Sequence, residues 1–107
     1  MKNAKKIDVK IHQLNNKNQF IINHNEMIYF QSYDSLIASY NTNTQKLIIG
    51  CDWDYSNTTR KHLYIFMSEY CFIYSGFTND LYYSKNKRQL IIKLIKNKVV
   101  SYDKNMQ

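Results

Sequence analysis

The residues of this chain that could act as chemical reagents are three histidines, two cysteines and eight carboxylates. His12, His24 and His62 are widely separated and share no metal-ligand spacing with Cys51 or Cys71. Metal sites usually show close pairs such as C-x-x-C, H-x-x-x-H or H-E-x-x-H, and the sequence contains none of these. The sequence therefore predicts neither a metal site nor a bound cofactor.

Two arrangements would still allow catalysis. A cysteine and a histidine would form a nucleophile pair if the fold brought them together, although Cys51 and Cys71 are more simply interpreted as buried free thiols. Asp52 and Asp54 are predicted to share one face of a strand, where they could bind a divalent cation or act as paired carboxylates. No third acid lies nearby, and capping of a following helix explains them as well. With no Gly-rich phosphate loop, the sequence predicts binding rather than catalysis, and no catalytic residue.

Basic side chains are the stronger candidates for function. The net charge of +7 is uneven, with +4 in residues 1–19, −3 in residues 20–80 and +6 in residues 81–98. Such asymmetry suits an anionic partner, because lysine and arginine contact phosphates while aromatic rings stack on bases. Residues 1–6 are predicted to form a flexible basic arm. The predicted binding residues are Lys85, Arg88, Lys93 and Lys96 of a C-terminal helix, Tyr82 and Tyr83 before it, and Arg60 and Lys61 of an earlier helix. The alternative is that these lysines form a simple solvated helix face.

The elements that must position these residues follow from periodicity. Alternation of Ile7, Val9 and Ile11 with polar residues indicates a first strand. Further extended segments at 20–22, 27–30, 35–40 and 46–51 are separated by Asn-rich turns. Together they predict a meander of antiparallel strands.

Two helices are predicted after residue 52. In the first, Leu63, Phe66, Tyr70 and Ile73 recur at helical spacing, between N-cap hydroxyls in residues 56–59 and a stop signal at Ser75-Gly76. The second has an apolar stripe over residues 90–95, with Ser84 as its expected cap, and residues 99–102 could add an edge strand. We predict one α+β domain over residues 1–107, an antiparallel β-meander of about four to five strands followed by two helices packed on the sheet.

Nothing in the sequence indicates a membrane or an export route. No apolar run reaches the roughly 18 residues of a membrane span. No apolar segment follows the basic N-terminus as it would in a secretory signal. We expect a cytoplasmic protein that does not contact a membrane.

Two motifs carry a resemblance to a known group of proteins. Residues 30–38 read FQSYDSLIA, and residues 53–63 read WDYSNTTRKHL. They resemble a family of small, largely uncharacterised proteins of phages and other mobile elements of bacteria, in which a "QSY-x-S-x-IA" strand precedes a strand ending in "W-D-Y-S-x-T-T". The resemblance implies that the cytoplasm is that of a bacterial host cell. The match covers roughly residues 28–70. The resemblance implies an origin on a mobile element, where small proteins often inhibit host defence, as anti-CRISPR proteins do.

The same motifs have a physical interpretation. Gln31, Ser32 and Ser35 could satisfy backbone groups at a bend, and Trp53 and Tyr55 are predicted on the strand face opposite the two aspartates. We therefore interpret them as signatures of the fold rather than as a binding site.

Two functions follow as expectations. The first is a non-enzymatic inhibitor that binds a host defence nuclease or its guide-RNA complex. The second is a small basic accessory protein that binds DNA or RNA. Mimicry of nucleic acid is disfavoured, because most nuclease inhibitors that mimic it are acidic and this chain is basic.

Overall fold

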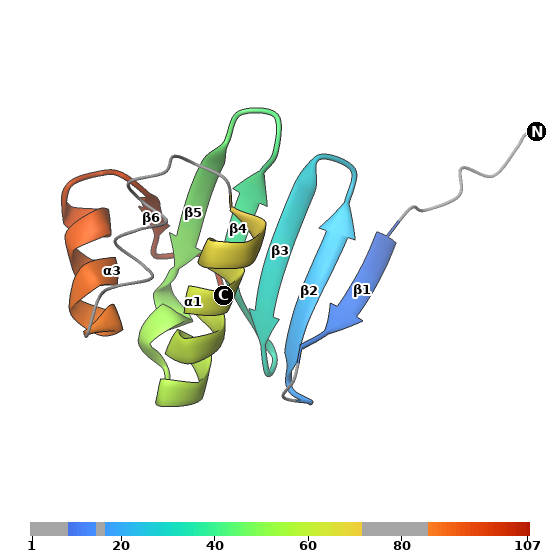
Figure 1. Ribbon diagram of the computed structural model, residues 1–107, viewed down its shortest axis with the longest axis horizontal. Coiled ribbons are helices and arrows are strands. Elements are labelled where there is room, and N and C mark those ends of the chain that lie inside the picture. Colours follow the sequence, from blue (N-terminus) through green and yellow to red (C-terminus); the bar gives the residue numbers. More distant parts are fainter. Residues whose placement is uncertain (1–8, 15–16, 72–85) are drawn as a thin grey trace, which may run out of the picture.

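The computed structural model describes residues 9–14, 17–71 and 86–107, and shows a six-stranded sheet with two helices (Figure 1). The predicted α+β class is confirmed. In chain order the elements are β1 (Val9–Gln13), β2 (Gln19–His24), β3 (Met27–Ser32), β4 (Ser35–Asn41), β5 (Lys46–Gly50), a 3₁₀ turn η1 (Cys51–Asp54), α1 (Asn57–Tyr70), α3 (Lys87–Lys96) and β6 (Ser101–Asp103).

The strands lie in the sheet in their order along the chain. Each of β1 to β5 is antiparallel to the next, which confirms the predicted meander. The last strand, β6, adds to the edge beyond β5 and runs parallel to it, with Ile48 opposite Ser101. A parallel neighbour needs a long crossover connection, and the part of the chain that contains both helices provides it.

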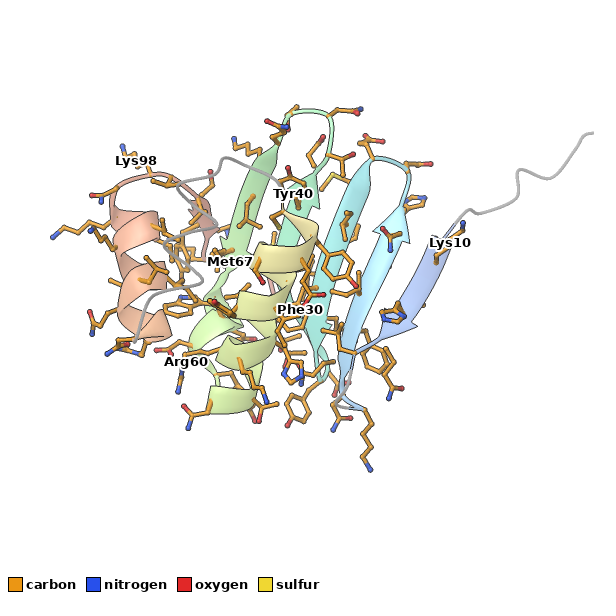
Figure 2. The ribbon with its side chains drawn as sticks, in the orientation of Figure 1. Lys10, Phe30, Tyr40, Arg60, Met67 and Lys98 are labelled. Carbon is orange, nitrogen blue, oxygen red and sulfur yellow. The ribbon has the colours of Figure 1, made fainter. Side chains whose placement is uncertain are left out.

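The core lies between the sheet and α1. Leu63, Phe66 and Met67 of α1 are fully buried against sheet residues that include Ile21 and Phe30. The rings of Phe30 and Phe66 stack with centroids 5.9 Å apart. Figure 2 shows the side chains of Phe30, Tyr40 and Met67 in this layer. The predicted apolar face of the first helix is therefore correct at Leu63 and Phe66.

The first strand is present but its apolar face is not covered. Val9 and Ile11 are 39% and 66% exposed. The pairing register gives the cause. Ile11 lies opposite Ile22, whereas the face toward α1 carries Ile21 and Phe30, so Val9 and Ile11 lie on the sheet face away from α1. Figure 1 shows α1 on one side of the sheet. Alternation in the sequence located the strand without revealing which of its faces the helix would cover.

Both predicted helix boundaries needed correction. The first helix ends at Tyr70, because Cys71 is already extended with φ −111° and ψ 101°. Ile73 and the expected stop signal at Ser75-Gly76 follow that end and lie outside the described residues. The second helix is capped by Asn86, whose side chain accepts a hydrogen bond from the Gln89 amide, and not by Ser84.

The described residues include no helix that is long and apolar enough to cross a membrane.

Candidate functional site

The site begins where β5 ends and the chain turns into α1. A Cβ atom on Gly50 would lie 2.6 Å from the carbonyl oxygen of Met106, so this position has room for glycine alone. The Cys51 amide donates a hydrogen bond to the same carbonyl at 3.1 Å. The strand therefore ends against the C-terminal segment, and Cys51–Asp54 form a 3₁₀ turn instead of continuing the strand.

This turn corrects the predicted placement of the two aspartates. Asp52 and Asp54 do not share a strand face, and they bind different partners. Asp52 Oδ2 accepts a hydrogen bond from Ser35 Oγ at 2.9 Å, while Asp54 contacts arginines. Trp53 is buried, whereas Tyr55 is 72% exposed, so these two residues do not share a face either. Because the aspartates are separated and individually bonded, the paired-carboxylate hypothesis is not supported.

The N-terminus of α1 is fixed by side-chain hydroxyls, as the sequence predicted. Ser56 is extended, and its Oγ accepts a hydrogen bond from the Thr59 amide at 3.1 Å. This bond satisfies one of the unpaired amides of the first helical turn. The buried hydroxyls of Ser32 and Thr59 lie 2.9 Å apart and join β3 to the helix. The start of α1 is thereby held to both the preceding turn and the sheet.

Asp54 connects the two helices. Its Oδ1 accepts from Arg60 Nη1 at 2.6 Å, and its Oδ2 accepts from Arg88 Nε at 2.8 Å. Partial desolvation by itself would raise the pKa of this carboxyl group, but the hydrogen bonds and charges of Arg88 and Arg60 outweigh it and lower the pKa. Arg60 also donates to Asn57 Oδ1. Asp54 is therefore ionised at neutral pH and holds one arginine of α1 and one of α3.

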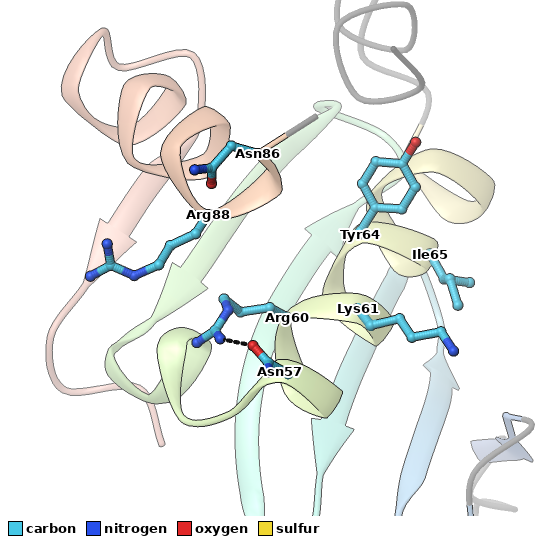
Figure 3. Close-up of a pocket in the computed structure, with 7 residues that line it drawn as sticks. All are labelled: Asn57, Arg60, Lys61, Tyr64, Ile65, Asn86 and Arg88. Atoms are coloured by element: carbon cyan, nitrogen blue, oxygen red, sulfur yellow. Dashed lines mark hydrogen bonds between the residues drawn. The ribbon is translucent and has the colours of Figure 1, made fainter. Parts of the chain in front are cut away.

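A cleft of about 650 Å³ lies between the two helices. In Figure 3 its α1 side carries Arg60, Lys61 and Tyr64, and its α3 side carries Arg88. The remaining described lining residues are Asn57, Ile65 and Asn86. Three cations and the neighbouring Asp54 leave this cleft with an excess of positive charge. We call this feature the basic cleft.

The structure places the predicted binding residues in two groups. Arg60, Lys61 and Arg88 come together at the basic cleft, although they belong to two helices. Lys93 and Lys96 are exposed in the last turn of α3 and do not line the cleft. The predicted contributions of Tyr82, Tyr83, Lys85 and the arm over residues 1–6 lie outside the described residues.

Asp54 was predicted from the sequence as a helix cap or as one of two paired carboxylates, and its contacts with Arg60 and Arg88 were not predicted. Asn57 and Arg60 are three residues apart on one helix, a spacing that could have indicated their contact. The contact between Asp54 and Arg88 spans 34 residues of chain, and no local pattern indicates it.

The pKa values of both cysteine thiols are raised. Burial raises the pKa of the Cys71 thiol, which confirms the expected buried thiol at that position. Cys51 is only half-buried, so the same expectation was wrong there; desolvation and the nearby Asp52 raise its pKa too. A neutral thiol is a poor nucleophile.

Two of the histidines are brought together. His12, His62 and Glu69 line a hollow of about 240 Å³ between β1 and α1, despite their distance in the sequence. His62 is buried, and its Nδ1 lies 2.8 Å from the carbonyl oxygen of Thr58. Over residues 9–14, 17–71 and 86–107, no group of three His, Cys, Asp or Glu side chains could hold a metal ion.

Comparison with known proteins identifies a family. Residues 5–90 match the model of a family of unknown function (DUF8033). The chain belongs to this family. The matched span contains β1 to β5, α1 and the start of α3, so it includes Asp54 and both of its arginine partners. No curated protein and no solved structure matches the chain.

Proposed function

We propose that this protein is a non-enzymatic inhibitor that binds a nuclease of bacterial host defence, or its complex with guide RNA, through the basic cleft. The observation that carries the proposal is the cleft itself. Arg60, Lys61 and Arg88 surround a hollow large enough for several side chains of a partner, and Asp54 fixes two of them in place. A fixed cationic surface loses little conformational entropy when an anionic partner binds.

Arg88 is the side chain best placed to meet that partner. It contacts Asp54 through Nε, and among the described residues its two Nη groups make no hydrogen bond. The side chain is 48% exposed. A guanidinium held in this way offers a preoriented pair of donors that fits a carboxylate or a phosphate.

Two considerations support an inhibitor over a general nucleic-acid binder. The resemblance to small proteins of mobile elements favours an inhibitor of host defence. The cleft also mixes arginine with tyrosine and with the apolar Ile65, a composition typical of protein interfaces.

The second candidate function is an accessory protein that binds DNA or RNA. The exposed Lys93 and Lys96 at the end of α3 favour it, because solvent-facing lysines readily contact a phosphate backbone.

The test of inhibition uses the full chain and one charge reversal in the cleft. Purified protein is added to an RNA-guided nuclease from a bacterial host, and the rate of target cleavage is measured. We expect the wild-type chain to slow cleavage and Lys61→Glu to lose most of this effect. Lys46→Glu is the matched control, because Lys46 is exposed at the opposite end of β5 from the turn that leads into α1. Equal inhibition by the two variants would contradict the role of the cleft.

A binding titration separates the two candidates. Fluorescence anisotropy with plain DNA and RNA is measured over a series of salt concentrations. A nucleic-acid binder shows affinity that falls steeply with salt, with a slope that decreases by about 0.9 for each phosphate contact removed. We expect Lys93→Glu combined with Lys96→Glu to reduce that slope if the second candidate is correct. An absence of binding at low salt, together with slowed cleavage by the nuclease, supports the inhibitor.

A further inference from the structure

Two exposed tyrosines from the two sequence motifs meet at one corner of the molecule. Tyr33 follows β3 and is 42% exposed, and Tyr55 precedes α1 and is 72% exposed. Their rings lie edge to face, with centroids 6.1 Å apart and an angle of 60° between the planes. They line a hollow of about 210 Å³ together with Asp34. We call this feature the tyrosine corner.

The backbone holds Tyr33 in a conformation that exposes its ring. Its φ is 55°, in the left-handed region that bulky residues rarely adopt. The Tyr33 amide donates to the Asn18 carbonyl at 2.7 Å, and its own carbonyl accepts from Gln31 Nε2 at 2.8 Å. These two bonds fix the turn, so the ring is directed outward instead of packing into the core. A strained residue held by its surroundings is more frequent at functional sites than elsewhere.

The polar groups beneath the rings are already bonded to one another. The hydroxyls of Ser32 and Thr59, which also line the hollow, lie 2.9 Å apart. Thr59 Oγ1 receives a second bond from Ser56 Oγ at 3.1 Å, and Ser56 caps the helix. These contacts give the hollow a fixed, neutral floor and partly satisfy the positive end of α1.

The charge at the rim is negative. Asp34 is exposed, and it makes no hydrogen bond or ion pair with the described residues. A second carboxylate, Asp52, lies behind Ser35, which also lines the hollow. Lys17 is exposed in the neighbouring turn, but it is not among the residues that line the hollow. The tyrosine corner therefore combines two aromatic rings with a carboxylate that has no partner in the described part of the chain.

We propose that the tyrosine corner is a docking site for one arginine side chain of a protein partner. The electron-rich faces of tyrosine attract a cation, and the planar guanidinium stacks on them while it pairs with Asp34. Small-molecule sites usually enclose about 300–1,000 Å³. The hollow of about 210 Å³ is smaller, and suits a single inserted side chain.

This site deepens the proposed function and rests on it for the statement that the partner is a protein. The basic cleft and the tyrosine corner lie on either side of the start of α1, because Asn57, Arg60 and Lys61 line one and Thr59 lines the other. The matching surface of a partner therefore carries an acidic group beside an exposed arginine. This pattern of opposite charges would fix the orientation of binding.

The test is an NMR titration of the full chain with the peptide acetyl-Gly-Arg-Gly-amide. The ring signals of Tyr33 and Tyr55 are followed, and the same peptide with citrulline replacing arginine serves as the neutral control. We expect saturable shifts at these rings with the arginine peptide alone. Tyr55→Leu and Asp34→Asn should each weaken binding about two- to fivefold. Tyr102→Leu is the matched control, because Tyr102 is an exposed tyrosine of β6 that does not line the hollow.

Three results would overturn the proposal. They are equal shifts with the citrulline peptide, wild-type affinity in both Tyr55→Leu and Asp34→Asn, and shifts produced by inorganic phosphate instead of by arginine. Amide spectra establish that each variant is folded, and Asp34→Asn changes charge with little change in shape. Since the titration contains no nuclease, its failure leaves the inhibitor proposal standing. Failure of the cleavage assay likewise leaves the measured peptide affinity standing.

Discussion

The contact of Asp54 with two arginines predicts a measurable loss of stability when its charge is removed. In Asp54→Asn the side chain keeps its size and one acceptor oxygen, but it no longer carries the charge that pairs with Arg60 and Arg88. The two guanidinium groups then face each other across the start of α1 without a counter-charge. We therefore expect the attachment of α3 to α1 to weaken.

The size of the expected loss of stability follows from the exposure of the three side chains. The exposed fraction is 22% for Arg60, 48% for Arg88 and 29% for Asp54, so water screens both ion pairs in part. Exposed ion pairs contribute about 0.2–1 kcal/mol each, and hydrogen bonds to charged groups in less exposed places contribute more. We expect Asp54→Asn to lower the free energy of unfolding by about 1–2 kcal/mol. For a domain of this size, that corresponds to about 5–10 °C in Tm.

The pH dependence gives a second, independent signature. The pKa of Asp54 is lower in the folded state than the value of about 3.9 for an unfolded chain. A carboxyl group whose pKa is lowered by folding contributes its full stabilisation when the pH is above its pKa in the unfolded chain. This stabilisation is lost as the pH falls through its pKa in the folded protein. The difference in the free energy of unfolding between wild type and Asp54→Asn should therefore be constant from pH 8 to about pH 5. It should shrink as the pH is lowered below about 4.

The assay is urea denaturation at several pH values and at low and high salt. Asp52→Asn is the matched control, because Asp52 is a nearby carboxylate that accepts hydrogen bonds from neutral groups, the Ser35 hydroxyl and the Cys51 thiol. The double variant Asp54→Asn with Arg88→Gln should lose less than the sum of the single variants, because the two residues interact. The reasoning would be refuted if Asp54→Asn were as stable as wild type at pH 7. It would also be refuted if the difference in their free energies of unfolding did not change with pH or with salt.

Three further predictions follow from single contacts. Ser56→Ala removes the cap bond to the Thr59 amide and should cost about 1 kcal/mol in urea denaturation; an unchanged midpoint would contradict the capping role. Gly50→Ala places a Cβ against the Met106 carbonyl and should lower the free energy of unfolding by about 1–3 kcal/mol, measured by thermal denaturation. An unchanged Tm would contradict the steric argument. Cys71 should resist a thiol reagent such as DTNB at pH 8 in the folded protein and react fully in urea, because burial raises its pKa; rapid labelling without urea would show that the thiol is accessible.

Features that depend on neighbouring residues could be predicted from the sequence. Alternation at Val9 and Ile11 located β1, and the hydroxyl of Ser56 located the start of α1. The spacing of Leu63 and Phe66 identified the buried face of that helix. These features depend on backbone geometry that repeats within a few residues, so their signals lie within a short stretch of sequence. The basic character of Arg60 and Arg88 was evident in the same way.

The arrangement of the functional groups could not be obtained from such patterns. Asp54 and Arg88 meet across 34 residues, and Tyr33 and Tyr55 meet only because β3 and the start of α1 lie side by side. The 3₁₀ turn that separates Asp52 from Asp54 begins where Met106 approaches Gly50 from the C-terminal segment. Contacts between distant segments depend on how the elements pack, and packing leaves no periodic signal in a single sequence. The sequence alone thus determined the elements and their charge, while the tertiary structure decided which charges and rings share a surface.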